Sequence, residues 1–139
     1  MREGCRNEME EKILGLDYGR VRVGVAVAEG GAARPLKVMR RVAGENLIEE
    51  VAELVKKGEF GKVVVGDPGG EIGKEVKGLV EKLEKAVGVL VVRWDETMSS
   101  CEAEKMAREA GFRMKKRRKL RDAWAAAVML QSYLENRDV

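Results

Sequence analysis

The chain has 139 residues, of which 45% are apolar and 37% charged, and it contains only two prolines. These values are typical of one globular domain with a substantial core, and they exclude a disordered or fibrous chain. The sequence has no histidine, which excludes Ser-His and Cys-His catalysis and metal sites with histidine ligands. Acid–base or metal chemistry would therefore have to come from carboxylates, Lys, Tyr or Cys.

The cysteines and the N-terminal residues predict a cytoplasmic protein. Cys5 and Cys101 lie far apart without a CxxC pattern, which favours free thiols in a reducing compartment and excludes a structural zinc site. Residues 1–11 are polar and lack the apolar core of a secretion signal, and no run is long enough to cross a membrane. We expect residues 1–11 to be a polar extension of a single domain over 12–139.

Three strands are predicted before the first helix. Apolar runs on both sides of Gly19 predict a β-hairpin over residues 13–27, with Gly19 supplying the positive φ of a tight turn. Residues 35–42 predict a third strand, and Pro35 assigns its start to a sheet edge or a strand entry. Asp17 ends the first strand. Considered alone, it is most simply a turn residue that hydrogen-bonds to nearby backbone.

The rest of the chain alternates between helices and strands. Periodic apolar residues predict helices over 47–55, 72–87, 99–110 and 120–134, and β-branched runs predict buried strands over 62–66 and 89–94. Gly58 and Gly88 are placed to end two of these helices. The strand–helix–strand order implies a parallel pair with a right-handed crossover. The predicted fold is α/β, with a five-stranded mixed sheet of three antiparallel and two parallel strands flanked by helices.

Acidic residues follow the predicted strands at the carboxyl ends where open α/β sheets bind ligands. Asp17 ends the first strand, Asp67 follows the fourth, and Asp95 and Glu96 follow the fifth. The alanine-rich last helix can pack closely on the sheet and bring Asp122 to the same edge. Carboxylates that converge in one cleft repel one another and need a cation, and an all-oxygen set suits Mg²⁺ or Mn²⁺.

Each of these acids also has a simpler structural interpretation. Asp95 rather than Glu96 could face the site, and Asp122 could oppose nearby positive charge at a helix N-terminus. Asp67 precedes Pro68 and is more simply a turn or cap residue than a ligand. The combination of acids at compatible strand and helix ends therefore indicates a metal site, whereas no single acid does.

The net charge of +3 conceals a strongly basic segment. Residues 113–121 contain seven of the 27 basic residues and no acid, which leaves 20 basic residues against 24 acidic ones elsewhere. A solvated loop would explain some clustering, but this density without acids favours a polyanionic partner. Phosphate contacts from this segment would hold a nucleic acid beside the acidic site.

The order and spacing of several motifs resemble the RuvX (YqgF) family of pre-16S rRNA nucleases, also described as Holliday-junction-resolvase-like, over residues 12–135. The motifs are Gly15-Leu16-Asp17-Tyr18-Gly19, Arg22-Val23-Gly24-Val25-Ala26, Val64-Val65-Gly66-x-Pro68, Asp95-Glu96, Lys115-Lys116-Arg117, Asp122-x-x-Ala125-Ala126 and Leu130-Gln131-Ser132-Tyr133-Leu134. The chain departs from the family at Asp67, where an apolar residue is usual, and at Thr97, where an arginine is common.

The resemblance implies an RNase H-like fold and a Mg²⁺- or Mn²⁺-dependent nuclease that acts in pre-16S rRNA 5′-end processing or on branched DNA. It implies that Asp17, Glu96 and Asp122 form an acidic triad that is both catalytic and metal-binding. The basic residues expected to bind the nucleic-acid backbone are Arg20, Arg22, Lys115, Lys116, Arg117 and Arg118.

Two other interpretations stay open. The chain could be a nucleic-acid-binding module that keeps the fold without catalysis. It could also be part of a sugar-kinase-like or actin-like ATPase, but that architecture closes two lobes around a nucleotide, and 139 residues supply one. The oligomeric state, monomer or homodimer, is also open, because cutting a four-way junction symmetrically would need two active sites.

Overall fold

The computed structural model describes residues 11–41, 46–96, 101–113 and 121–137. The elements are β1 (Ile13–Tyr18), β2 (Arg22–Glu29), β3 (Ala32–Arg40), α1 (Leu47–Gly58), β4 (Lys62–Asp67), α2 (Gly70–Val87), β5 (Leu90–Asp95), α3 (Cys101–Arg113) and α4 (Arg121–Asn136). This order of strands and helices confirms the one predicted from the sequence.

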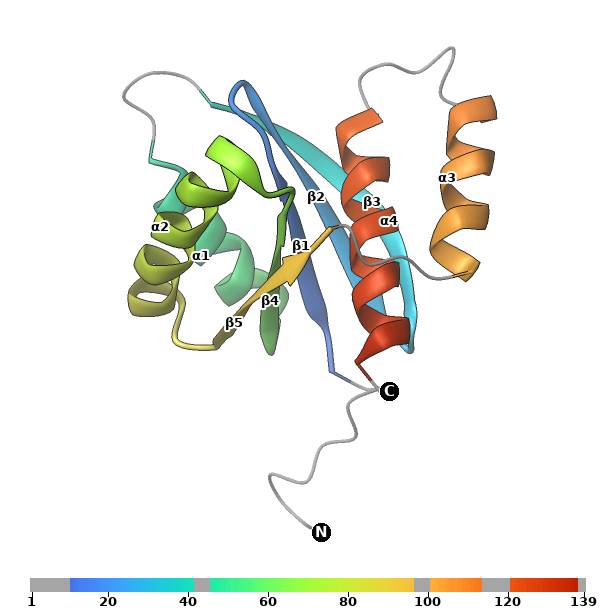
Figure 1. Cartoon of the computed structure of the whole chain (residues 1–139). Coiled ribbons are helices and arrows are strands. Elements are labelled where there is room, and N and C mark those ends of the chain that lie inside the picture. The colour runs from blue at the N-terminus through green and yellow to red at the C-terminus, as the bar shows by residue number, and fades with distance from the viewer. Residues whose placement is uncertain (1–10, 42–45, 97–100, 114–120, 138–139) are drawn as a thin grey trace, which may run out of the picture.

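The five strands form one mixed sheet in the order β3-β2-β1-β4-β5. β1, β2 and β3 pair antiparallel, whereas β4 runs parallel to both β1 and β5. Helices cover both faces of the sheet (Figure 1), with α1 and α2 on one face, α4 on the other, and α3 packed on the outside of α4. The predicted arrangement of three antiparallel and two parallel strands is confirmed.

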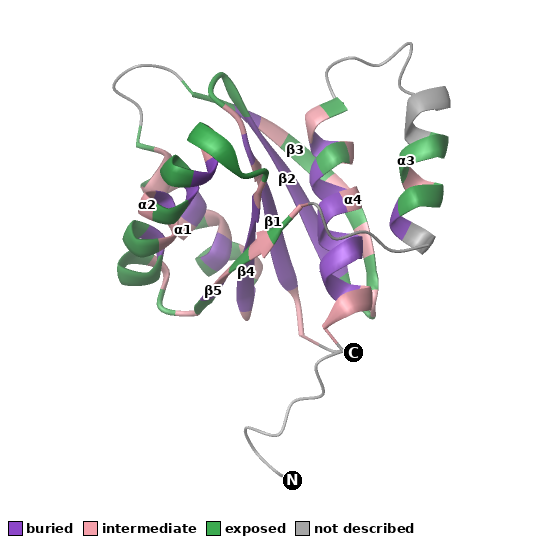
Figure 2. Cartoon of the chain, viewed as in Figure 1, coloured by how far each residue is buried: buried purple, intermediate pink, exposed green. Residues whose placement is uncertain are grey.

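Each face of the sheet has its own hydrophobic core, because successive side chains of a strand point to opposite faces. The face under α1 and α2 consists mainly of larger aliphatic residues, such as Leu16 and Val65. The face under α4 contains many small residues, such as Ala26 of β2 and Ala127 of α4. Figure 2 shows that the central strands and the inner side of α4 are buried. The small residues let α4 lie close to the sheet.

The ends of α1 and α2 test the predictions for two glycines. Gly88 follows α2 with a φ of 69°, as predicted. Gly58 was expected to lie just beyond α1, but it is the last helical residue, and Glu59 takes the left-handed conformation with a φ of 55°. Gly58 is required for space instead, because a Cβ there would lie 2.5 Å from the Phe60 ring.

The turn between β1 and β2 corrects the prediction for Gly19. In the structure, Gly19 does not have a positive φ. Its backbone N–H donates to the carbonyl oxygen of Arg22 at 3.0 Å, and a Cβ on Gly19 would lie 2.7 Å from that oxygen. Glycine is therefore needed here for a close backbone approach rather than for its conformational freedom.

The strand β3 begins earlier than predicted, at Ala32, so Pro35 lies within it. The strand is at the edge of the sheet, where a missing N–H can face solvent. The pairing of β2 with β3 shifts register between Val25 and Ala26, and Ala26 is the partner of Pro35. The expected edge position is confirmed, and the irregular register accommodates Pro35.

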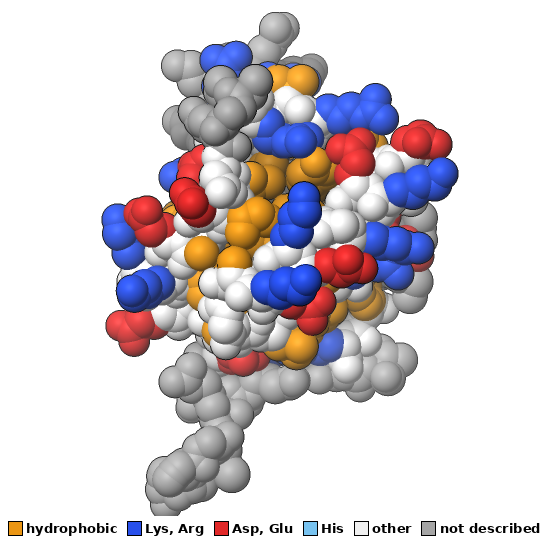
Figure 3. All heavy atoms as spheres, turned by 90° about the vertical axis from the view of Figure 1, so that its left-hand side faces the viewer, with side chains coloured by type: hydrophobic (Ala, Val, Ile, Leu, Met, Phe, Trp, Pro, Cys, Tyr) orange, Lys and Arg blue, Asp and Glu red, His pale blue; other side chains and the backbone are white. Residues whose placement is uncertain are grey.

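On the outer side of α1 and α2, charged side chains of both signs surround a strip of partly buried hydrophobic side chains (Figure 3). Each of these helices has acidic residues in its first turn and basic residues in its last, which suits the helix dipole. None of the helices in the described ranges is both long and apolar enough to span a membrane.

Candidate active site

Three elements bring the predicted acidic residues to the carboxyl end of β1. Asp17 lies in β1, between Gly24 of β2 and Gly66 of β4. Glu96 follows β5, and its backbone N–H is hydrogen-bonded to the end of β4 at 3.0 Å. Asp122 lies in the first turn of α4. The position of α4 across the strands therefore determines how close Asp122 lies to Asp17 and Glu96.

Two glycines make room for this arrangement. A Cβ at Gly24 would overlap the backbone carbonyl of Asp122, so glycine is needed for the N-terminus of α4 to lie against β2. A Cβ at Gly66 would lie 2.9 Å from the carboxyl group of Glu96. Both glycines flank Asp17 in the sheet. The strand positions on either side of Asp17 therefore carry no side chain, which leaves room for the other acidic residues.

Burial and the negative charge of a neighbouring acid raise the pKa values of both Asp17 and Glu96. Burial is the main cause for Asp17, followed by the negative charge of Asp122, and the pKa rises to about 6. Burial is again the main cause for Glu96, followed by the charge of Asp17, and the pKa rises to about 7. A hydrogen bond between the two side chains lowers the pKa of Asp17 and raises that of Glu96. The pair therefore holds a proton at higher pH than an isolated carboxyl group would.

One carboxyl oxygen in this pair has no partner. Among the residues that the structure describes, Glu96 Oε2 is buried and forms no hydrogen bond. Leaving such an oxygen unpaired is costly, and buried polar atoms in folded proteins are normally satisfied. A hard divalent cation such as Mg²⁺ or Mn²⁺ would satisfy it and would favour the ionised form of both carboxyl groups. The pair Asp17 and Glu96 thus fits a cation-binding role.

The third predicted acid, Asp122, has a different partner. The Nε of Arg22 donates to Asp122 Oδ2 at 2.7 Å. Consistent with this, the described part of the chain contains no ready-made cluster of three or more His, Cys, Asp or Glu residues that could hold a metal ion. For all three acids to bind one cation, Asp122 would have to offer its second oxygen, Oδ1, or give up its bond to Arg22.

Asp67 and Asp95 lie on the opposite face of the sheet, because they alternate along their strands with the residues that face α4. Asp67 accepts hydrogen bonds from the backbone N–H of Gly69 at 2.7 Å and from Arg93 at 3.0 Å. The turn interpretation of Asp67 is therefore confirmed. Both aspartates still act on the site through space, because their negative charges help to raise the pKa of Glu96.

Comparison with known proteins identifies the family. The RuvX family, described as a Holliday junction resolvase, matches residues 11–136. The chain belongs to this family. A relative from Syntrophus aciditrophicus, named "Putative pre-16S rRNA nuclease", is 39% identical over 132 residues, covering 89% of this chain and 88% of the relative. A relative of the same name from Anaeromyxobacter sp. (strain Fw109-5) is 40% identical over 134 residues, covering 91% of this chain and 98% of the relative.

Solved structures share the fold of this RuvX-family chain. Thermus thermophilus RuvC, in complex with a Holliday junction substrate, is 20% identical with a TM-score of 0.55, covering 90% of this chain and 95% of that one. The fowlpox virus Holliday junction resolvase is 13% identical with a TM-score of 0.59, covering 89% and 97%. These likenesses confirm the RNase H-like fold that the sequence motifs implied.

The arginines predicted to bind a nucleic-acid backbone occupy two positions at the site. Arg20 lies in the turn between β1 and β2 and forms an ion pair with Glu75 of α2 at 3.6 Å. Arg22 begins β2 and is bound to Asp122. Both side chains are more than half exposed, at 64% and 55%, so a ligand can reach them. The predicted phosphate-binding segment 115–118 lies outside the described residues.

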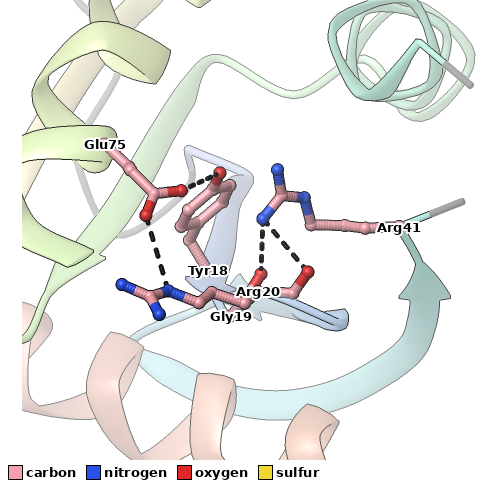
Figure 4. Close-up of polar contacts among 5 residues, drawn as sticks. All are labelled: Tyr18, Gly19, Arg20, Arg41 and Glu75. Atoms are coloured by element: carbon pink, nitrogen blue, oxygen red, sulfur yellow. Dashed lines mark hydrogen bonds and ion pairs between the residues drawn. The ribbon is translucent and has the colours of Figure 1, made fainter. Parts of the chain in front are cut away.

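A polar cluster that the sequence did not reveal holds the turn between β1 and β2 (Figure 4). The Tyr18 hydroxyl donates to Glu75 at 3.1 Å. Arg41 donates to the carbonyl oxygens of Gly19 and Arg20 at 3.1 and 3.3 Å, and its guanidinium lies 4.6 Å from the centre of the Tyr18 ring. Burial, followed by the hydrogen bond to Glu75, raises the pKa of Tyr18. The turn that carries Arg20 is therefore fixed both by α2 and by the residue that follows β3.

Proposed function

We propose that this RuvX-family chain is a Mg²⁺- or Mn²⁺-dependent nuclease that hydrolyses phosphodiester bonds during 5′-end processing of pre-16S rRNA. The observation that carries the proposal is the half-buried pair Asp17 and Glu96, whose pKa values are both raised and in which one oxygen of Glu96 is unpaired within the described residues. The family match supports a nuclease, and the names of the curated relatives support the rRNA substrate.

The three acids would hold the cation through their carboxylate oxygens. A bound divalent cation supplies Lewis-acid stabilisation of the phosphate and activates water for attack. Loss of a proton from the pair Asp17 and Glu96 would accompany cation binding, because ligating carboxylates must be deprotonated. Asp122 would share its charge between the cation and Arg22 or give up Arg22, and the positive charge of Arg22 would then be less fully compensated.

Basic residues would position the substrate by contacting its phosphates, since such contacts set the orientation of a nucleic acid without reading its sequence. Arg20 is suited to this role because Glu75 and Arg41 fix the turn on which it lies. Arg22 is suited because it stands between the acidic site and solvent. The segment 115–118 would extend the same contacts along the substrate.

The test is cleavage of a labelled pre-16S rRNA end, with a four-way DNA junction as a second substrate, in Mg²⁺, Mn²⁺ or EDTA. We expect cleavage that requires the metal and falls at least about 100-fold in Asp17→Asn, because even residues that only support a metal ligand contribute 10–100-fold. Asp67→Asn is the matched control, since this acid lies on the other face and has its own partners. Its cleavage should fall far less than that of Asp17→Asn, because Asp67 acts on Glu96 only through space.

The outcomes separate the substrates and the mechanism. Equal cleavage by wild type and Asp17→Asn would contradict the proposed site. Cleavage of the junction but not of the rRNA would reassign the substrate to branched DNA. Metal-dependent cleavage of the rRNA at its mature 5′ end would establish the proposal in full.

Nucleic-acid binding without cleavage is the second candidate function. The observation that favours it is the ion pair between Arg22 and Asp122, which leaves only Asp17 and Glu96 in contact with each other. This alternative predicts tight binding that EDTA does not change, and no cleavage of either substrate in any metal.

A further inference from the structure

The strand β3 places one more arginine beside the acidic site. Arg40 is the direct partner of Arg22 in the ladder between β2 and β3, and both residues are exposed. Directly opposed residues on neighbouring strands point to the same face of the sheet. That face is the one under α4, because Arg22 reaches Asp122 at 2.7 Å. Arg40 therefore places a positive charge next to Arg22, on the side of the acidic site that faces the edge of the sheet.

The charge of Arg40 is not balanced within the described residues. Arg22 has Asp122 as a partner, but the side chain of Arg40 forms no hydrogen bond, ion pair or ring contact there. Like charges placed directly opposite each other destabilise a sheet. Asp122 offsets part of this cost at Arg22, but no contact in the described part of the protein neutralises Arg40, and an anion would do so.

Arg41, which follows Arg40, has a separate role. Its guanidinium lies over the Tyr18 ring and donates to turn carbonyls (Figure 4). Its backbone N–H also donates to the carbonyl oxygen of Val21 at 2.8 Å, which ties the end of β3 to the turn of the hairpin. Arg40 thus projects from a fixed backbone, and little ordering of the chain is needed for it to bind a ligand.

We propose that Arg40 binds a phosphate of the nucleic-acid substrate, and that the substrate backbone crosses the β2–β3 edge of the sheet on its way to Asp17. The guanidinium group suits this role because it forms paired hydrogen bonds with phosphate oxygens. Arg40 and Arg22 place two positive charges side by side on adjacent strands. A nucleic acid, which carries a row of phosphates, suits such a pair better than a single small anion does. This inference rests on the proposed function.

Cation binding strengthens the role of Arg40. If Asp122 also held a cation, its charge would compensate Arg22 less fully, and the repulsion between the two opposed arginines would grow. A substrate phosphate then relieves their repulsion, so the metal and the nucleic acid favour each other's binding through this pair. Arg40 acts in substrate positioning and does not contact the reacting atoms in this scheme.

The test is the binding of a fluorescein-labelled single-stranded RNA, measured by anisotropy in EDTA over a range of salt concentrations. The variants are Arg40→Gln, Arg40→Lys and Arg34→Gln. Arg34 is the matched control because it lies at the other end of β3 and pairs with the exposed Glu29 at 3.4 Å. Arg34→Gln thus removes the same charge from the same strand, away from the acidic site.

We expect Arg40→Gln to weaken binding about fivefold and to reduce the slope of log K against log[salt] by about 0.7, the value for one phosphate contact on a single strand. Arg40→Lys should keep the slope, and Arg34→Gln should match the wild type. Equal losses in Arg40→Gln and Arg34→Gln, or no loss in either, would overturn the inference. Absence of wild-type binding would refute the nucleic-acid function as well, so the two failures are distinguishable.

Discussion

At the carboxyl edge of the sheet, an acidic residue on one face has hydrogen-bond partners, whereas two acidic residues on the other face lie close to each other. On the face under α2, Asp67 is matched by a backbone N–H and by Arg93. On the face under α4, Asp17 and Glu96 repel each other, and an oxygen of Glu96 is unpaired within the described residues. Yet the backbones of Asp67 and Glu96 are joined by a hydrogen bond of 3.0 Å. The face to which a side chain points, rather than its distance from the site, thus separates the structural acids from the functional candidates.

The two faces of the sheet also differ in the size of the side chains that pack on them. The α2 face consists mainly of aliphatic side chains. The α4 face has glycines at Gly15, Gly24 and Gly66, and a Cβ at Gly15 would lie 3.0 Å from Leu130. Glycine lowers strand stability because it has no side chain to pack. On this face the same absence of side chains lets α4 lie close to the strands. The close approach of the helix is what brings a third acid to the site.

The largest effect should follow from blocking that approach with Gly24→Ala. The added Cβ would overlap the backbone of Asp122, and backbone cannot move aside as a flexible side chain can. We expect the free energy of unfolding to fall by about 3 kcal/mol, at the upper end for overpacking, together with loss of cleavage. Urea unfolding followed by circular dichroism measures the first effect.

Gly78→Ala is the control for Gly24→Ala. Gly78 lies within α2, and a Cβ there would meet nothing within 4 Å. The change should increase stability by about 0.5–1 kcal/mol, because alanine is the better helix former. A loss of stability in Gly24→Ala no greater than about 0.5 kcal/mol would show that α4 does not depend on the bare backbone.

Neutralising one acid on each face should change stability in opposite directions at pH 8 in EDTA. Glu96→Gln removes a charge that burial disfavours, so we expect a gain of about 1 kcal/mol, with partial exposure limiting the effect. Asp67→Ala removes two hydrogen-bond partnerships, so we expect a loss of about 1 kcal/mol. Urea unfolding of both variants beside the wild type measures the difference.

The pH dependence tests the cause of the Glu96→Gln gain. The pKa of Glu96 rises from 4.5 to about 7 in the folded protein, so between these values the native state holds a proton that the unfolded chain has lost. Stability of the wild type should therefore fall as the pH rises from about 4.5 to 7. Glu96→Gln should flatten this fall and give no gain at pH 4. A gain that is constant with pH would contradict the ionisation argument.

The smallest effect should come from Tyr18→Phe on the other face. The phenol donates to Glu75 at 3.1 Å, and Glu75 is exposed. We expect a loss of about 0.5–1 kcal/mol in the free energy of unfolding, typical of one hydrogen bond, with cleavage nearly unchanged. A loss of cleavage comparable to that of Asp17→Asn would mean that the turn holding Arg20 is essential to the site.

Much of the fold was predictable because its signals are local. The hairpin around Gly19, the periodic helices and the β-branched strands at the centre are each encoded within short stretches of sequence. The left-handed conformation of Glu59 was not predictable, since the sequence offered Gly58 as the helix stop, whereas Gly58 is the last helical residue and is close to the Phe60 ring. The start of β3 was missed because Pro35 suggested a boundary, whereas the edge strand tolerates it.

The site was predictable only in part, because its contacts join distant residues. The sequence placed Asp17 and Glu96 at one edge, and the structure brings them into contact. It could not show that Arg22 binds Asp122, 100 residues further along the chain. The separation of Asp67 from the site did have a local signal, because strand residues alternate between faces and Asp67 directly follows Gly66. The catalytic and metal-binding roles of the acids stay predictions.

The position of Asp122 also sets when the site forms. The chain emerges from the ribosome with its N-terminus first, and early segments can fold before later ones are made. The strands β1 to β5 therefore emerge before α4. Until α4 packs against Gly24, Asp17 and Glu96 lie on an uncovered face without their third partner. A chain from which α4 has not yet emerged therefore lacks the complete set of acids. Cleavage of ribosomal RNA, the proposed activity, would begin only after α4 has packed against the sheet.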